Sequence, residues 1–151
     1  MGKLFGTDGI RGVVNAGLDA DLAYKVGLAA ATVLAKKKGG KPLVTIGKDT
    51  RISGDLLKGS LISGLCTAGA DVLDLGTLPT PGVAWVTVDE EADAGIVISA
   101  SHNPFEHNGI KVFNGQGYKL SDALEERVEE KILSNEPMPT KKGGDIGKRI
   151  H

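Results

Sequence analysis

Residues 95–113 read GIVISASHNPFEHNGIKVF and place a polar loop between two apolar runs. The first run, Ala94–Ser99, is short, apolar and rich in β-branched residues, which predicts a buried strand. The second run, Ile110–Phe113, predicts another strand. Only about ten residues separate the two runs, and they show no helical pattern. We therefore expect the two strands to pair antiparallel, which makes the sheet a mixed one.

Strand and helix patterns alternate along the rest of the chain. Apolar residues at helical spacing follow Asp19 and Asp21, and they predict a helix that ends near the lysines 36–38 and Gly39. We further expect a strand at 43–46, a helix at 53–68 and a strand at 72–75. Thr80 is then expected to be the N-cap of a short helix that has Pro81 at its first position and runs through Trp85, and Ser121 is expected to cap a last helix. This alternation predicts an α/β domain with a mixed, mostly parallel sheet of four strands.

Length and charge exclude several classes of protein. The chain has 151 residues, 40% of them hydrophobic, which is enough for one ordinary domain core. Its net charge of -1 disfavours a nucleic-acid binder that relies on neutralising phosphates. No apolar run reaches the roughly 20 residues of a membrane span, and the N-terminus lacks the apolar segment of a signal peptide. Cys66 is the single cysteine, which suits a reducing cytoplasm.

Glycine content and the C-terminal composition add two expectations. Glycine occurs 22 times and aromatic residues make up only 4%, which favours loops that bind phosphate through the backbone over lectin-like stacking sites. From Asn135 onward the apolar periodicity is lost. We therefore expect one domain at residues 1–136, and a linker with the start of a second, missing domain at residues 137–151.

Polar residues follow the strand 94–99 at its carboxyl end, where open α/β sheets bind ligands. Ser101, His102 and Asn103 lie there, and Asn108-Gly109 is expected to turn the chain so that Lys111 returns to the same place. A serine, an imidazole and an ammonium group suit group transfer on an anionic substrate, with the serine as nucleophile. A side-chain-capped turn without chemistry is the alternative interpretation.

Two further interpretations of this loop are open to objection. A hydrolase dyad of Ser101 and His102 is disfavoured, because adjacent residues on an extended chain point to opposite faces. A metal site of His102, Glu106 and His107 matches none of the common ligand spacings.

Two glycine-containing loops are further candidates for phosphate binding. In Phe5–Gly12, which reads FGTDGIRG, the glycines let the backbone approach a ligand while Arg11 offers two donors to a phosphate. The alternative is a glycine-rich N-terminal strand with an exposed arginine. In Gly47–Gly54, which reads GKDTRISG, we expect an ion pair of Asp49 and Arg51 that braces the start of the next helix. This loop lacks the ending of a P-loop.

These motifs resemble those of a known enzyme family. Ser99–Pro104 (SASHNP), followed by Asn108–Lys111 (NGIK), resembles the phosphoserine loop of the α-D-phosphohexomutases. Phe5–Gly12 and Gly47–Arg51 are similar to loops of the bacterial phosphoglucosamine mutases in particular, and the resemblance extends from residue 3 to about residue 150. It implies a three-layer α/β/α domain, the first of four. The metal-binding, sugar-specificity and C-terminal phosphate loops belong to the other domains, so we expect this chain to be inactive alone.

The resemblance also implies an activity and its residues. The parent would be an isomerase that interconverts glucosamine 6-phosphate and glucosamine 1-phosphate, a step toward UDP-N-acetylglucosamine and the cell wall. Ser101 would be the phosphorylated residue, Lys111 would neutralise charge or move a proton, His102 would assist proton transfer, and Arg11 would contact the phosphoserine. Mg²⁺ would bind phosphorylated Ser101 together with aspartates of the missing second domain.

The implied partners follow from that activity. The parent would bind a phosphorylated amino sugar and form a homodimer, with neither nucleic acid nor membrane as a partner. Two alternatives remain open on the residues alone. A sibling phosphoglucomutase or phosphomannomutase shares the serine loop, and the chain could also serve as a non-catalytic binding or oligomerisation module.

Overall fold

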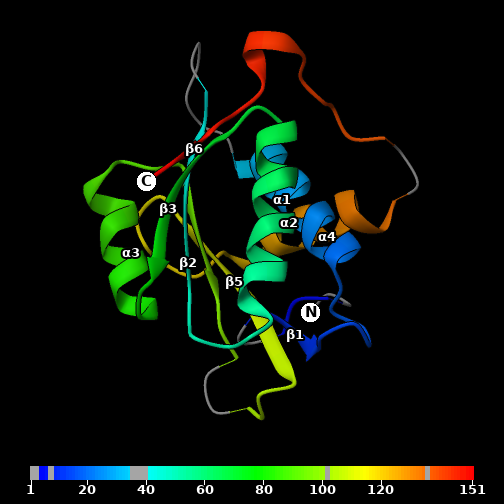
Figure 1. Cartoon of the computed structure of the whole chain (residues 1–151). Helices are drawn as coiled ribbons and strands as arrows, with labels where there is room; N and C mark the ends of the chain where they lie inside the picture. Colours follow the sequence, from blue (N-terminus) through cyan, green and yellow to red (C-terminus); the bar gives the residue numbers. More distant parts are fainter. Residues whose placement is uncertain (1–3, 7–8, 35–40, 101–102, 135–136) are drawn as a thin grey trace.

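One mixed β-sheet runs through the molecule (Figure 1). The computed structural model describes residues 4–6, 9–34, 41–100, 103–134 and 137–151. The strands lie in the order β1-β5-β4-β2-β3-β6 and comprise β1 (Ile10–Val13), β2 (Leu43–Lys48), β3 (Asp71–Thr77), β4 (Ala94–Ile98), β5 (His107–Asn114) and β6 (Arg149–Ile150). β2 is parallel to β4 and β3, and β3 to β6, whereas β5 is antiparallel to β4 and β1. The mixed sheet and the antiparallel pairing of β4 with β5 confirm the prediction.

The sheet has six strands in the described part of the chain, whereas the sequence predicted four. The two additional strands, β1 and β6, lie at its two edges and contain four and two residues. Such short segments cannot show a clear alternation of apolar and polar residues. They are strands because a remote partner pairs with them, so the local sequence does not identify them.

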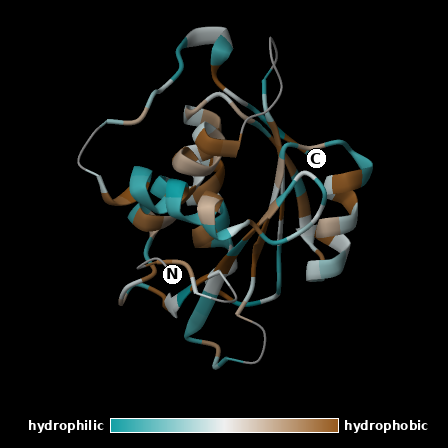
Figure 2. Cartoon of the chain, turned by 180° about the vertical axis from the view of Figure 1, so that it is seen from behind, coloured by the Kyte–Doolittle hydropathy of each residue, from teal (hydrophilic) through white to brown (hydrophobic). Residues whose placement is uncertain are grey.

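Helices cover both faces of the sheet and complete a three-layer α/β/α domain (Figure 1). One face packs against three helices, namely α1 (Ala20–Leu34), α2 (Gly54–Thr67) and α4 (Asp122–Leu133). The other face packs against α3 (Thr80–Asp89). Apolar residues line the strands, while polar residues predominate on α4 (Figure 2). No helix in the ranges given above is both long enough and apolar enough to cross a membrane.

The helix ends agree largely with the sequence patterns. The Oγ of Ser121 accepts a hydrogen bond from the amide of Leu124 at 3.3 Å, which confirms the predicted N-cap of α4. The prediction for α3 was too short, because the helix continues to Asp89, and its N-cap is Pro79 rather than Thr80. The predicted lysine-rich end of α1 and its Gly39 stop lie outside the described residues.

Alternation along the strands assigns side chains to the two faces. Core residues such as Ile98, Ile110 and Val112 point to the face that packs on α1, α2 and α4. The residues between them point to the α3 side, where Thr45 on β2 lies 2.6 Å from Thr87 on α3, measured between the hydroxyl oxygens. The α3 side therefore receives the side chains that alternate with these core residues along the strands.

Two glycines let α1 and α2 approach to backbone contact. A Cβ at Gly27 on α1 would lie 2.5 Å from the carbonyl oxygen of Leu61 on α2. A Cβ at Gly64 on α2 would collide with the carbonyl oxygen of Tyr24 and lie 2.9 Å from the amide nitrogen of Leu28. The spacing between α1 and α2 is therefore one that only glycine allows at these positions.

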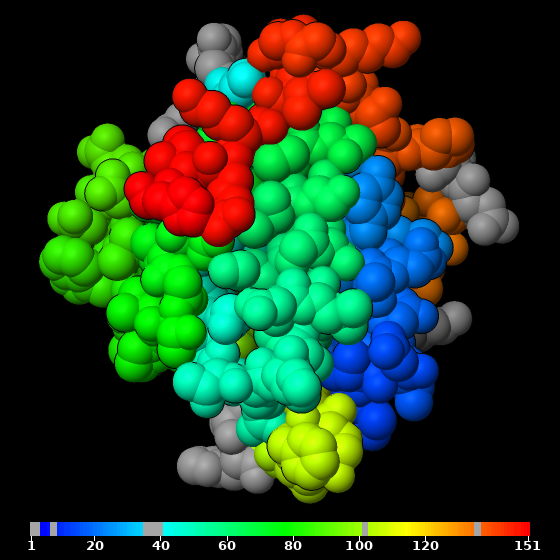
Figure 3. Space-filling model, viewed as in Figure 1, coloured from blue at the N-terminus to red at the C-terminus, as the bar shows by residue number. Residues whose placement is uncertain are grey.

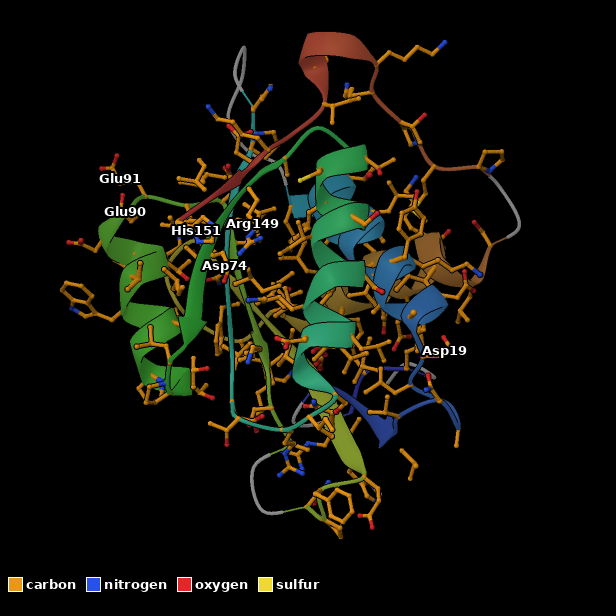
Figure 4. All side chains as sticks on the ribbon, in the orientation of Figure 1. Asp19, Asp74, Glu90, Glu91, Arg149 and His151 are labelled. Atoms are coloured by element: carbon orange, nitrogen blue, oxygen red, sulfur yellow. The ribbon has the colours of Figure 1, made fainter. Side chains whose placement is uncertain are left out.

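A buried carboxylate connects β6 to the sheet. Asp74 on β3 has a side chain only 2% exposed, and it contacts Lys58 Nζ at 3.0 Å and Arg149 Nε at 2.9 Å (Figure 4). Its Oδ1 also accepts a hydrogen bond from the amide of Gly76. Burial by itself would raise the pKa of Asp74, but the Gly76 hydrogen bond and the two cations outweigh burial and lower this pKa. The C-terminal segment accordingly lies against β3 and α2 (Figure 3).

We expect Asp74→Asn to lower the free energy of unfolding by about 2 kcal/mol near pH 7, because charge-assisted hydrogen bonds are lost. A carboxylate whose folded pKa is lowered stabilises the fold above its unfolded pKa, and this stabilisation disappears as the pH falls through the folded pKa. Urea titrations of both proteins at about pH 7 and about pH 3 check this. The difference between the two free energies should be smaller at the lower pH than at the higher one. An equal difference at both values would contradict the charge as the cause.

Candidate active site

The two predicted cationic residues lie on one face of the sheet. Arg11 on β1 is opposite Gly109 on β5, and Lys111 follows two residues later on β5, opposite Val97 on β4. Directly paired residues of antiparallel strands share a face, and so do residues two apart on one strand. Arg11 and Lys111 therefore both point to the α3 side of the sheet.

The two other predicted residues, Ser101 and His102, lie outside the described residues, as does Asp8. Backbone hydrogen bonds hold the chain on either side of them. The amide of Ser99 donates to the carbonyl of Gly109 at 2.9 Å, and the amide of Asn103 donates to the carbonyl of Ala100 at 3.1 Å. We call residues 99–107, up to the first residue of β5, the serine loop. The loop follows the carboxyl end of β4 and leads into β5, where Lys111 lies opposite Val97 on β4.

The predicted turn at Asn108-Gly109 is wrong, because both residues lie inside β5. Asn108 is fully buried, and its side-chain nitrogen donates to Ser53 Oγ at 2.9 Å. At Gly109 a Cβ would lie 2.8 Å from the carbonyl oxygen of Ser99 and 3.0 Å from Cγ of Arg11. The asparagine thus connects β5 to the residue before α2, and the glycine lets the Arg11 side chain cross close over β5.

The predicted ion pair of Asp49 and Arg51 is present, with Arg51 Nε 3.2 Å from Asp49 Oδ2. The pair was expected to brace the start of the next helix, and the structure adds a second set of contacts. Arg51 Nη1 donates to the carbonyl oxygens of Asn103 at 2.8 Å and Pro104 at 2.7 Å, both in the serine loop. The loop after β2 therefore supports the loop after β4.

A recess of about 210 Å³ lies beside Lys111, and it is lined by Gly9, Thr80, Lys111, Val112, Phe113, Lys119 and Glu125. The ammonium group of Lys119 forms an ion pair with Glu125 at 3.0 Å. Lys111 thus borders a hollow where a small anionic group can approach a positive charge.

Neither a metal centre nor a cysteine nucleophile is formed by the described residues. No group of three or more His, Cys, Asp or Glu side chains among them is arranged to hold a metal ion. Of the metal hypothesis on His102, Glu106 and His107, the first residue lies outside the described part. Burial raises the pKa of the Cys66 thiol, and the nearby charge of Asp71 raises it further. Cys66 is therefore a protonated thiol at neutral pH.

Sequence reasoning missed Glu129, which holds the N-terminal segment that leads into β1. Its carboxylate is almost fully buried on α4, where Oε1 accepts hydrogen bonds from the amides of Leu4 at 2.8 Å and Phe5 at 2.5 Å. A signal was available, because Glu129 lies beside Val128 and three residues before Ile132 on the apolar face of the predicted helix. An acidic residue at such a position needs a buried donor.

The known proteins that match this chain agree with one another. Residues 2–138 match phosphoglucomutase/phosphomannomutase, alpha/beta/alpha domain I. The chain is 58% identical to a phosphoglucosamine mutase from Acetivibrio thermocellus over 99% of this chain and 34% of that protein, and 54% identical to one from Moorella thermoacetica over 98% and 33%. It therefore spans about a third of the length of these relatives.

A solved structure agrees with these relatives. A phosphoglucomutase/phosphomannomutase family protein from Burkholderia thailandensis matches with a TM-score of 0.77 and 30% identity. The match covers 97% of this chain and 32% of that one. The three-layer fold, the serine loop at the carboxyl end of β4 and the match over residues 2–138 agree, and the chain belongs to the phosphoglucomutase/phosphomannomutase family as its alpha/beta/alpha domain I.

Proposed function

We propose that this chain is the phosphoserine-bearing domain of a phosphoglucosamine mutase, with Ser101 as the phosphorylated residue. The observation that supports it most is the placement of Arg11 and Lys111 on one face of the sheet, beside the loop that contains Ser101. Phosphoryl transfer is catalysed mainly by alignment and by neutralising charge on the phosphoryl oxygens. Two cations beside a serine loop meet that requirement.

Each of the four residues has its own role in the proposed phosphoryl transfer. Ser101 Oγ receives a phosphoryl group from a bisphosphorylated amino sugar and returns it to a monophosphate. Arg11 donates hydrogen bonds to the phosphoserine oxygens, and Lys111 neutralises charge on the group in transit or moves a proton. His102 assists with proton transfer between the serine and the sugar hydroxyl. All four roles are proposals for the full-length parent, in which this domain is joined to the remaining two thirds of a mutase.

The proposal includes a magnesium ion. Phosphoserine oxygens are hard ligands of the kind Mg²⁺ prefers, and the described residues add no carboxylate cluster beside them. An oxygen of phosphorylated Ser101 would hold the ion together with aspartates outside this chain. When bound, Mg²⁺ would supply positive charge that offsets the phosphate. The proposed setting is cytoplasmic amino-sugar metabolism that feeds the cell wall, with a homodimeric parent.

Intact mass of the full-length parent tests the nucleophile. After incubation with glucosamine 1,6-bisphosphate, we expect the wild type to gain the mass of one phosphate and Ser101→Ala to gain none. Ser63→Ala is the matched control, because Ser63 is an exposed serine on α2, and it should gain the phosphate normally. Phosphate uptake by Ser101→Ala would contradict the assignment of the nucleophile.

We expect the 151-residue chain alone to interconvert no glucosamine phosphates. The relatives are about three times as long, and the loops that hold the metal and the sugar belong to their remaining length on this proposal. A coupled assay on chain purified free of host mutase checks it. Measurable turnover by the pure chain would show that these residues hold a complete active site.

The sibling enzymes give a second candidate function, because the family that matches is that of the phosphoglucomutases and phosphomannomutases. A phosphoglucomutase or phosphomannomutase would use the same serine loop on a different sugar. Comparison of kcat/KM for glucosamine 6-phosphate, glucose 6-phosphate and mannose 6-phosphate in the parent decides between them. The proposal requires the highest value for glucosamine 6-phosphate.

A further inference from the structure

One arginine holds the backbone of the serine loop from outside it. The Nη1 of Arg51 lies 2.8 Å from the carbonyl oxygen of Asn103, 2.7 Å from that of Pro104 and 3.2 Å from that of His107. The side chain of Arg51 is only 12% exposed. A positive donor in a partly dry setting makes stronger hydrogen bonds to carbonyls than water does. Three carbonyls of a polar surface loop are thereby held at one point.

The guanidinium is itself held in place. Asp49 accepts hydrogen bonds from Arg51 Nε at 3.2 Å through Oδ2 and from the Arg51 amide at 3.1 Å through Oδ1. The amide of Asp49 in turn donates to the carbonyl of Ile98, the last residue of β4. The side-chain nitrogen of buried Asn108 donates to Ser53 at 2.9 Å. The loop at 49–53 therefore contacts the end of β4 through Asp49, the serine loop through Arg51 and the start of β5 through Ser53.

These contacts surround Ser101 in the sequence. Ile98 and Asn103 lie three residues before it and two residues after it, and both are bonded to the loop at 49–53. We propose that Arg51 is a positioning residue, which fixes the serine loop so that the phosphoserine oxygen is aligned with the sugar phosphate. This inference rests on the proposed function. On this proposal, Arg51 acts through the backbone of the loop rather than by binding the phosphate or the sugar.

The planar shape of arginine explains why lysine is a poor substitute here. Nε binds Asp49 while Nη1 reaches the carbonyls, so one rigid group makes both contacts in fixed directions. A lysine ammonium is a single point of charge and can occupy only one of these two places. Arg51→Lys therefore retains the charge but releases either Asp49 or the loop.

The test measures kcat and KM of the full-length parent on glucosamine 6-phosphate, with each rate divided by the fraction of phosphorylated protein from intact mass. A displacement of about 1 Å in a reacting group can cost on the order of 10²-fold in rate, so we expect Arg51→Lys to lower kcat about 10- to 100-fold. KM should change by less than about threefold, because no substrate contact is lost. Arg127→Lys makes the same change on the exposed side of α4, and it should retain the wild-type kcat.

A second variant keeps the test decisive if Arg51→Lys fails to fold. Asp49→Asn preserves the shape of the side chain but removes the charge that orients Arg51, so kcat should fall in the same direction and by a smaller factor. A role in folding alone would reduce the amount of phosphorylated protein and leave the corrected kcat unchanged, and that result would overturn the inference. A wild-type parent without mutase turnover would overturn the proposed function as well. Normal wild-type turnover with an unaltered corrected kcat in both variants overturns the positioning role alone.

Discussion

Replacing Lys111 by methionine in the full-length parent is expected to lower kcat about 10²- to 10³-fold while KM changes little. Methionine keeps most of the length of the lysine stem, so the side chain still packs on β5 and the strand keeps its pairing with β4. What is lost is a positive charge next to the phosphoryl group in transit. Such a charge interacts most strongly with the transition state, and its loss therefore appears in turnover rather than in binding.

Steady-state kinetics on glucosamine 6-phosphate measures this effect. Lys25→Met is the matched control, because Lys25 lies on α1, pairs with Asp21 at 3.0 Å and is 46% exposed. The control should retain the wild-type kcat. If Lys111→Met also retained it, the proposed catalytic role of Lys111 would be wrong, and the residue would be only a charge on the face of the sheet.

Gly64→Ala is expected to destabilise this chain by about 3 kcal/mol. The added methyl group would collide with the carbonyl oxygen of Tyr24 on α1, and neither helix can move without disturbing the core that both cover. Gly59→Ala is the matched control on the same helix, because nothing lies within 4 Å of its Cβ position. Alanine is the better helix former there, so this variant should gain up to about 1 kcal/mol.

Urea unfolding followed by circular dichroism gives both free energies, and it also shows whether the 151 residues unfold in one cooperative transition. The two glycine variants should move the midpoint in opposite directions. Equal midpoints for Gly64→Ala and Gly59→Ala would contradict the close approach of α1 and α2.

The sequence predicted two kinds of element, namely strands that are apolar throughout and helices with apolar residues at helical spacing. The buried strands β2 and β4 are short apolar runs, and α2 and α4 show helical spacing with recognisable ends. The edge strand β6 was missed, and β1 appeared only as the alternative interpretation of Phe5–Gly12, because a partner defines such short strands. The Asn108-Gly109 turn was predicted wrongly because tertiary contacts override a local preference, since Asn108 is buried against Ser53.

For the candidate site, charged side chains were easier to find than their partners. The sequence indicated three of these side chains, Arg11, Arg51 and Lys111, because glycines or turn residues surround each of them. The carbonyls that Arg51 binds leave no trace in the sequence, because every residue has one. The contact joins residues 52 to 56 positions apart, and only the folded chain reveals it.

The strand β5 has little freedom to evolve in length. Its even-numbered residues Ile110 and Val112 fill the core, while Lys111 between them faces the opposite side. Deleting or inserting one residue within the strand would exchange the two sets, so that an ammonium group would enter the core and isoleucine would take its place at the recess. Changes of length within β5 should therefore remove stability and charge placement together.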